Sequence, residues 1–296
     1  MASKYRVHHS RMPRERQGRA TFAVAIVDHG TSEQLREAIE WYRAHLNHNL
    51  FVVTVGEAPL EEWDDVSFIV FATWATLGEK INAVANECMA NYFLITRSDL
   101  YLVRFDGQRL FAKGTSRIAW ASVVANSHKE IVPSLRIPHM EGDRIEADSD
   151  FPLLDEERGV RTLYPLLGLG LYDRAVFQRL RGFDEHIESS YYQLLDWGLR
   201  AALMGHRVIS TSALLMQFIE RESVIEDRSE KNGSLRCYTK ALSYKKKRDG
   251  TIELKKPKRA FFDRSVWKDE VKPRLRWQVK EDFPSLVASW KQEEEQ

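Results

Sequence analysis

Apolar runs and helical periodicities alternate in the first third of the chain. Two segments, 32–46 and 77–90, carry apolar residues three or four positions apart, which predicts amphipathic helices. Runs that are apolar on both faces, as buried parallel strands are, occupy 22–27, 50–55, 67–72 and 92–96. This order of elements predicts a mainly parallel sheet that is covered by helices.

The pattern is weaker after residue 100. Asp106-Gly107 predicts a hairpin turn. The stretch 141–158 is acidic with few apolar residues, and we expect it to form an exposed loop. Further strands are expected at 101–105, 109–112, 117–125 and 207–216, and a further helix at 187–204.

Polar or small residues follow three of the predicted strands directly. Asp28 follows the first strand, Gly56 follows the second, and Arg97 to Asp99 follow the fourth. Ligands of parallel sheets bind beyond the carboxyl ends of the strands. The predicted topology therefore makes these residues candidates for a binding site.

Charge is distributed unevenly along the chain of 296 residues, although the formal net charge is only +1. Residues 1–19 carry six Lys and Arg residues against one Glu, and residues 240–280 carry fifteen against five acidic residues. We therefore expect a basic N-terminal arm at 1–19, an acidic body at 20–219, and a basic C-terminal extension with several aromatic residues at 220–296.

The composition argues against several classes of protein. Cys88 and Cys237 lie far apart, so neither a zinc finger nor a disulfide scaffold is indicated. The N-terminus lacks the apolar core of a secretory signal, and no apolar run reaches the roughly 18 residues that a spanning helix needs. The cytoplasm is the expected location, and contact of the basic extension with a membrane surface is an open alternative.

Two blocks of the sequence resemble family-2-type glycosyltransferases with a GT-A fold. In the upstream block, 77–102, Gly78 and Asn82 match a Gly and an Asn of the family's helix. The strand that follows ends, in the family, at an Asp-x-Asp motif. Arg97-Ser98-Asp99 occupies that motif here, so only its last carboxylate is present.

The downstream block, 180–208, resembles the acceptor side of the same family. Arg181 replaces the first Gly of the family's Gly-Gly-Phe-Asp-Glu turn, and Gln193-Leu194 replaces its Glu-Asp pair. The matching positions are Gly182, Phe183, Asp184, Glu185, Asp196, Arg200 and Gly205. Including the first strand, the resemblance covers residues 22–216.

The resemblance implies an α/β fold of the GT-A type, with a mixed, mainly parallel sheet flanked by helices and followed by the C-terminal extension. It also implies transfer of a sugar from a nucleotide sugar, with inversion at the anomeric carbon. The acceptor, which is a glycan, a lipid-linked group or a protein in such reactions, is not identified by the sequence.

The donor side of the expected site centres on Asp99, which the resemblance makes the candidate ligand of a divalent cation, Mn²⁺ or Mg²⁺. Arg97 puts that cation in doubt, because a guanidinium repels a metal and binds phosphate itself. Three alternatives are open for Arg97. It substitutes for part of the metal's charge, it marks a site that has lost the metal, or it only forms an ion pair with Asp99. The other donor-binding candidates are Asp28 and Glu57 for the nucleoside, and Lys80 and Asn82 for the diphosphate.

An acceptor hydroxyl must lose its proton to a base, which is usually a carboxylate. Because the family's Glu-Asp pair is absent, Asp196 is the first candidate, and Glu188 or Glu185 in the preceding turn is the alternative. The alternative for Asp196 is a structural ion pair with Arg200, four residues further along the helix.

Three functions are compatible with these features. The first is a glycosyltransferase that uses a nucleotide sugar. The second is a catalytically impaired protein of the same fold that binds a sugar nucleotide, a glycan or a protein partner. The third is a polyanion-binding module that uses the basic C-terminal extension.

Overall fold

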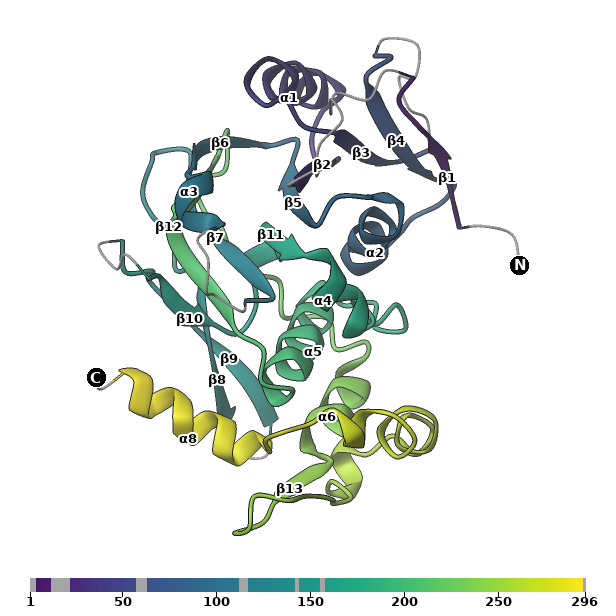
Figure 1. The fold of residues 1–296 in the computed structure, drawn as a ribbon, viewed down its shortest axis with the longest axis vertical. Helices are drawn as coiled ribbons and strands as arrows, with labels where there is room; N and C mark the ends of the chain where they lie inside the picture. The colour runs from purple at the N-terminus through teal and green to yellow at the C-terminus, as the bar shows by residue number, and fades with distance from the viewer. Residues whose placement is uncertain are drawn as a thin grey trace.

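The predicted alternation of strands and helices builds a large mixed sheet (Figure 1). The computed structural model describes residues 4–11, 22–56, 63–111, 117–141, 144–154 and 158–294. In this part of the chain ten strands pair in the order β1-β4-β3-β2-β5-β11-β7-β12-β10, and β6 also pairs with β12. Strands β2, β3, β4, β5, β7 and β12 run in one direction, while β11 is inserted antiparallel between β5 and β7. The predicted fold class, a mixed and mainly parallel sheet flanked by helices, is therefore confirmed.

The strands of this sheet are β1 (Tyr5–His8), β2 (Phe22–Val27), β3 (Leu50–Val55), β4 (Val66–Phe71), β5 (Tyr92–Arg97), β6 (Leu100–Phe105), β7 (Ala119–Ala125), β10 (Val160–Thr162), β11 (Gly170–Asp173) and β12 (Val208–Phe218). The helices that pack on it are α1 (Ser32–His45), α2 (Leu77–Glu87), α3 (Gly107–Leu110), α4 (Arg174–Arg179) and α5 (Ser190–Leu203). The short 3-10 turn η1 (Leu166–Gly168) leads into β11.

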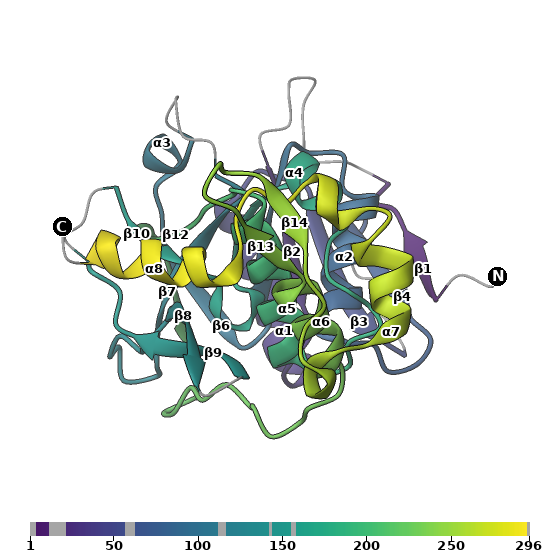
Figure 2. The same cartoon turned by 90° about the horizontal axis from the view of Figure 1, so that it is seen from below.

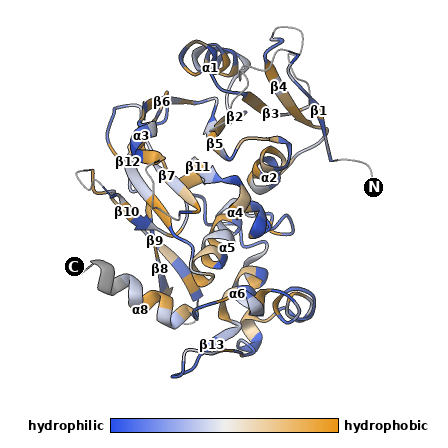
Figure 3. Ribbon diagram, in the orientation of Figure 1, coloured by the Kyte–Doolittle hydropathy of each residue, from blue (hydrophilic) through white to orange (hydrophobic). Residues whose placement is uncertain are grey.

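The sheet separates two apolar layers, and β2 shows why. All six of its residues are buried, and successive side chains of a strand point to opposite faces. Ala23, Ala25 and Val27 belong to the layer that contains α2 and α5. Phe22, Val24 and Ile26 belong to the layer that contains α1 and β6. Figure 3 shows most of the central strands in the colour of apolar residues.

Both helices that follow the first strands begin at a capping box. The side chain of Thr31 accepts a hydrogen bond from the backbone N–H of Gln34, and the Gln34 side chain accepts one from Thr31 in return. Thr76 and Glu79 make the same reciprocal pair at the start of α2. Such boxes satisfy backbone donors that have no partner inside the helix. They fix where the chain turns from the sheet edge into each helix.

Two local predictions from the sequence were wrong. The stretch 141–158 is not one loop, because β8 (Leu135–Glu141) and β9 (Arg144–Asp150) form an antiparallel hairpin. Ile145 and Ala147 are fully buried and alternate with the acidic residues, so the two-residue period of a strand was present. The strand expected at 109–112 is replaced by α3, because the side chain of Asp106 caps a helix instead of starting a hairpin.

The C-terminal extension packs against the rest of the protein as an additional layer, which lies at the bottom of Figure 1 and faces the viewer in Figure 2. Val271, Phe283, Leu286 and Trp290 are buried in the same apolar cluster as α5. The elements of this layer are α6 (Ser234–Leu242), β13 (Tyr244–Lys246), β14 (Ile252–Leu254), η2 (Arg259–Phe261), α7 (Arg264–Val266), η3 (Trp267–Val271), η4 (Leu275–Trp277) and α8 (Phe283–Glu294). The boundary at residue 219 therefore does not separate two apolar cores.

The outer edge of the sheet is closed by β1, which pairs antiparallel with β4 over Tyr5–His8. The ammonium of Lys4 lies 2.7 Å from a carboxylate oxygen of Glu79 and 2.9 Å from one of Glu185. Part of the predicted N-terminal arm is thus a strand of the sheet. Across the described ranges, no helix is both long enough and apolar enough to cross a membrane.

Candidate functional site

A cavity of about 350 Å³ opens beyond the carboxyl ends of β2 and β5. It is bordered by the loop between β4 and α2, the first turn of α5, the η1 turn and the segment after β12. This is the edge at which the sequence placed the ligand site. The lining residues used below are His29, Trp74, Lys80, Arg97, Leu167, Leu194, Arg221, Ile225, Glu226 and Asp227.

Arg97 and Arg221 converge at this edge on a single carboxylate, that of Asp99. Arg97 donates to both carboxylate oxygens of Asp99, with distances of 2.8 Å from Nε and 2.7 Å from Nη2. Arg221, which follows β12, places its Nε 3.2 Å from Asp99 Oδ2 and donates from Nη2 to Nε2 of His29 at 2.8 Å. Two guanidinium groups therefore share one acidic partner, and the cluster keeps an excess of positive charge.

The donor set does not fit a divalent cation. Such cations require several oxygen ligands, and both oxygens of Asp99 already accept hydrogen bonds or ion pairs from arginine. In the described ranges no three His, Cys, Asp or Glu side chains are grouped to hold a metal. The third alternative for Arg97, an ion pair with Asp99, is the arrangement that the structure has.

Lys80 adds a further cation to the cavity wall from the first turn of α2. Its side-chain ammonium makes no hydrogen bond or ion pair with another described residue. Burial lowers the pKa of its ammonium, and the nearby carboxylate of Asp28 opposes that shift. Asp28 itself accepts a hydrogen bond of 3.0 Å from the hydroxyl of Thr54 at the end of β3. Asp28 and Lys80 thus lie together at the predicted edge of the sheet.

The remaining walls of the cavity are largely apolar. Leu194, which stands where the family has a carboxylate, lines it together with Leu167. Leu167 has a φ of 53°, an unusual conformation for a residue other than glycine. At the mouth, the side chains of Trp74 and Ile225 are 71% and 81% exposed. These residues add exposed apolar surface at the mouth of the cavity.

Glu226 contributes a buried carboxylate to the lining. Its Oε2 accepts from Nε of Arg136 and from the hydroxyl of Tyr164, each at 3.2 Å. Its Oε1 is buried and has no hydrogen-bond partner among the described residues. Buried acceptors are rarely left without a donor, so Oε1 is available to a hydroxyl group of a ligand.

Three of the predicted site residues lie elsewhere, namely Asn82, Glu188 and, as described below, Asp196, and a fourth cannot be placed. Asn82 bonds the acceptor-side turn: it donates to the carbonyl of Phe183 and accepts from the same residue's N–H, each at 2.9 Å. Glu188 is exposed, accepts from Asn232 at 3.1 Å, and does not line the cavity. Glu57 lies outside the described residues.

Gln193, which stands at the first position of the family's Glu-Asp pair, has a structural role at the start of α2. The side chain of Gln193 accepts from the backbone N–H of Gly78 at 2.9 Å and donates to the hydroxyl of Thr76 at 2.8 Å. A side chain on Gly78 would collide with Gln193, because an added Cβ would lie 2.8 Å from Nε2. Gln193 therefore joins the starts of α2 and α5, which both border the cavity.

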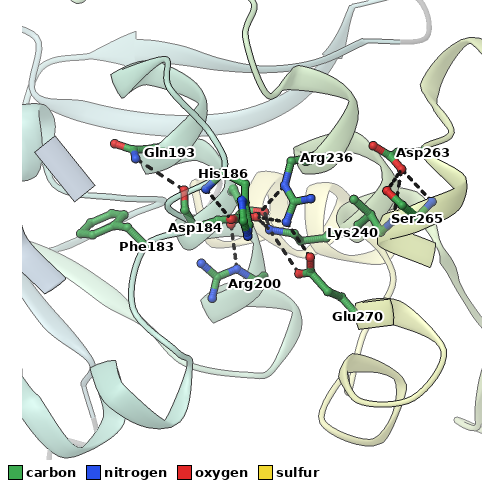
Figure 4. Close-up of polar contacts among 12 residues, drawn as sticks. Phe183, Asp184, His186, Gln193, Arg200, Arg236, Lys240, Asp263, Ser265 and Glu270 are labelled. Atoms are coloured by element: carbon green, nitrogen blue, oxygen red, sulfur yellow. Dashed lines mark hydrogen bonds and ion pairs between the residues drawn. The ribbon is translucent and has the colours of Figure 1, made fainter. Parts of the chain in front are cut away.

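Asp196 is enclosed in a network of charged residues instead of facing the cavity. Figure 4 shows other members of this network, among them Asp184, Lys240 and Glu270. Its side chain is 1% exposed. One oxygen lies 2.8 Å from Nε of Arg200, and the other lies 2.9 Å from the ammonium of Lys240 in the C-terminal layer. Arg200 also donates to the carbonyl of Gly182 at 2.7 Å. This placement favours the structural alternative for Asp196 over the role of a base.

Asp184 is the second carboxylate of this network, and Lys240 binds it as well. Arg236 lies 2.9 Å from Asp184 and also pairs with Glu270 of η3. Burial alone would raise the pKa of Asp184, but the charges of Lys240 and Arg236 and the hydrogen bond from Lys240 hold it well below its ordinary value. The network fixes the turn at 182–185, α5 and the C-terminal layer to one another.

Three contributors to the cavity or the network were missed in the sequence. Arg221 follows the carboxyl end of β12, a strand parallel to β7, so the rule that selected Asp28 and Asp99 would have selected it too. Trp74 lies in the connection from β4 to α2. An aromatic residue in a connection at this edge of the sheet could have been recognised as a candidate for the binding site. Lys240 sits on α6 beside buried Cys237 and Ala241, a position at which a lysine needs an acidic partner.

Comparisons with known proteins agree on the fold. No family model matches the sequence, and no curated protein matches it. The structure of GalNAc-T7 with UDP, GalNAc and Mn²⁺ has a TM-score of 0.56 and 12% identity over 95% of this chain. The mannosyltransferase PcManGT from Pyrobaculum calidifontis, in complex with GDP-Man and Mn²⁺, has a TM-score of 0.48 and 11% identity, with 93% of this chain and 76% of that chain covered.

The match to GalNAc-T7 covers 55% of that protein, so this chain spans about half of its length. At this identity the similarity concerns the fold alone. The similar structures are GT-A-type glycosyltransferases, and the chain has their mixed sheet of mostly parallel strands flanked by helices.

The network predicts that Lys240 stabilises the fold. Lys240→Met leaves two buried carboxylates, Asp184 and Asp196, short of a cation, which we expect to lower the free energy of unfolding by about 3–5 kcal/mol. Urea denaturation followed by circular dichroism measures this value. Lys268→Met, which removes an exposed cation of the same layer, is the control and should have little effect. Equal effects of the two substitutions would contradict the prediction.

The depressed pKa of Asp184 predicts sensitivity to acid. A carboxyl group whose pKa is lowered by folding contributes stability that is complete above the unfolded-state pKa, about 4, and is lost as the pH falls below it. We expect the free energy of unfolding to fall below about pH 4, and to fall less steeply in Asp184→Asn. Urea titrations between pH 3 and pH 6 test this, and parallel pH profiles for the two proteins would exclude Asp184 as a source of the acid sensitivity.

Proposed function

We propose that this protein binds a nucleotide sugar, or the nucleoside diphosphate that remains after sugar transfer, in the cavity beyond β2 and β5. The observation that carries the proposal is the convergence of Lys80, Arg97 and Arg221 on one cavity at the carboxyl edge of a GT-A-type sheet. Diphosphates are bound by such groups, because guanidinium and ammonium donors form short, charge-assisted hydrogen bonds with phosphate oxygens. The family-2-type assignment of the sequence is part of this proposal.

The cations take the place of a metal in this mode of binding. Arg221 is half exposed at the cavity, so part of its guanidinium can reach a ligand while Nε remains near Asp99. Lys80 has no competing acidic partner at hydrogen-bond distance, so its ammonium is available for a phosphate. Arg97 is held rigidly by Asp99, and its charge acts on the ligand at close range without a large loss of side-chain entropy.

The rest of the cavity suits the other parts of the ligand. Its volume of about 350 Å³ lies within the range of small-molecule sites. Trp74 and Ile225 provide apolar surface for the flat face of a sugar ring or a base. The unpartnered Oε1 of Glu226 can accept from a sugar hydroxyl.

The proposal predicts nucleotide binding without a metal ion. In a panel of UDP, GDP, dTDP and their sugars, at least one ligand at hundredfold excess over its Kd should raise the melting temperature by about 5 °C, with EDTA present throughout. Arg221→Gln should weaken that ligand by about 10- to 100-fold, because a hydrogen bond to a charged phosphate is lost. Isothermal titration calorimetry measures the affinities.

Arg179→Gln is the matched control, since Arg179 is an exposed cation on α4 outside the cavity. Unchanged melting with every nucleotide would refute the proposed site. A shift that requires Mn²⁺ and disappears in EDTA would refute the metal-independent mode and restore Asp99 as a metal ligand.

Sugar transfer to an acceptor, with inversion, is a second candidate function that rests on the same site. It is favoured by Asp227, an exposed carboxylate that lines the mouth of the cavity. Hydrogen bonds from the hydroxyl and the backbone N–H of Ser229 lower the pKa of Asp227, which makes it a weaker base. Nucleotide binding is therefore better supported than sugar transfer, because transfer requires a base in addition to the binding site.

The second candidate predicts slow hydrolysis of the bound nucleotide sugar that depends on Asp227. Asp227→Asn should lower the rate by about 100-fold or more while the Kd for the nucleotide stays within a factor of two. Release of free sugar, followed by chromatography, measures the rate. Glu40→Gln, which removes an exposed carboxylate of α1, serves as the control. If wild type and Asp227→Asn turn over equally, Asp227 is not the base.

A further inference from the structure

The C-terminal layer has a basic surface that the nucleotide site does not use. None of the residues that line the cavity belongs to the part of this layer from α6 to α8. Of the fifteen Lys and Arg residues between 240 and 280, thirteen are exposed, and only Lys240 and Arg276 are not. The β13–β14 hairpin with the segment 255–259 carries eight of the exposed cations: Lys245, Lys246, Lys247, Arg248, Lys255, Lys256, Lys258 and Arg259.

The acidic residues of the layer do not neutralise this charge, because most of them have partners inside the layer. Asp249 accepts from Thr251 in the hairpin turn, and Glu253 pairs with Lys247 at 2.8 Å. Asp263 caps α7, and Glu270 pairs with Arg236. Glu281 lies 3.9 Å from Lys246, and Asp269 is exposed, but residues 240–280 still carry fifteen cations against five acidic residues. The surface therefore attracts anionic partners.

An exposed aromatic side chain stands beside the basic hairpin. The side chain of Trp277 in η4 is 72% exposed. Together with Arg276, whose guanidinium carbon lies 3.8 Å from the centre of the Trp277 ring, it borders a shallow groove of about 340 Å³ whose other wall is Ile252 to Leu254. The patch thus combines apolar surface with surrounding cations. Figure 3 shows the polar colour of the hairpin turn, and Figure 2 shows this layer facing the viewer.

We propose that this surface, defined as residues 245–259 together with Arg276 and Trp277, docks on an anionic lipid bilayer. Tryptophan side chains favour the boundary between hydrocarbon and head groups, where the ring is buried and the indole N–H stays hydrated. Basic residues near such a boundary are attracted to anionic head groups. The half-buried Ile252 and Leu254 extend the apolar surface next to Trp277.

The side chains present fit a bilayer better than a nucleic acid. Proteins that bind single strands stack successive bases on several aromatic residues. Within residues 245–259 and η4, Trp277 is the exposed aromatic side chain. A single aromatic ring surrounded by cations suits the surface of a bilayer. The ring can enter the boundary between head groups and hydrocarbon, while the cations contact the anionic head groups around it.

Cosedimentation of the full chain with vesicles tests the proposal. We expect binding to phosphatidylcholine vesicles that contain 30% phosphatidylglycerol, weak binding to pure phosphatidylcholine, and a loss of binding as the salt concentration rises. Replacing Arg248, Lys255 and Lys256 by Gln should weaken binding about 100-fold, at roughly fivefold for each cation. Trp277→Ala should weaken it roughly tenfold. It should also remove the quenching of tryptophan fluorescence by brominated lipid.

A matched triple variant, in which Arg6, Lys129 and Arg179 are replaced by Gln, removes the same charge from exposed positions outside the layer and should bind like the wild type. All variants should keep the melting temperature and nucleotide affinity of the wild type. Vesicle binding that is equal in the two triple variants, or absent in the wild type, would overturn the proposal. Binding of RNA or heparin through the same residues, without binding to the vesicles, would also overturn the proposal.

Discussion

The position of α5 depends on one buried ammonium group, that of Lys240. It lies between Asp184, in the turn before α5, and Asp196, in the middle of the helix. Two carboxylates in an apolar cluster are unfavourable unless cations accompany them, and Arg200 supplies only part of that charge. Because Lys240 comes from the C-terminal layer, that layer is required for the geometry of α5, whose first turn forms one wall of the cavity. The site is therefore held together by a residue that does not touch its ligand.

The chemistry at the sheet edge differs from the family pattern in a consistent direction. Where the family has two carboxylates, this chain has Arg97 and Asp99, and Arg221 adds a second guanidinium. Where the family has a Glu-Asp pair, this chain has Gln193, which ties two helices together, and Leu194, which faces the cavity. Each replacement removes negative charge near the expected diphosphate. These replacements agree with the proposed binding of an anion, and they leave fewer groups that could remove a proton.

The sequence predicted the parts of the molecule that depend on local patterns. Buried strands and amphipathic helices have distinct periods, so the central sheet and its edge could be predicted before any contact was known. Local patterns could have marked Arg221 and Lys240 as candidates, but they could not identify the partners of these residues. Those partners are distant in sequence and become neighbours only when β12 and α6 pack. Asp196 shows the same limit: its position matched the family, but its exposure and its partners are decided by the C-terminal layer.

The short strand β1 has a consequence for the solubility of the protein. It occupies the outer side of β4, whose sequence VSFIVF is apolar and rich in β-branched and aromatic residues. Without β1, the backbone groups on that side of β4 would be an open template for other chains, and segments of this type form intermolecular sheets readily. A polar four-residue strand thus acts as a cover against self-association. A change that detaches β1 from β4 would therefore promote self-association of the protein, even where the ligand site itself is unchanged.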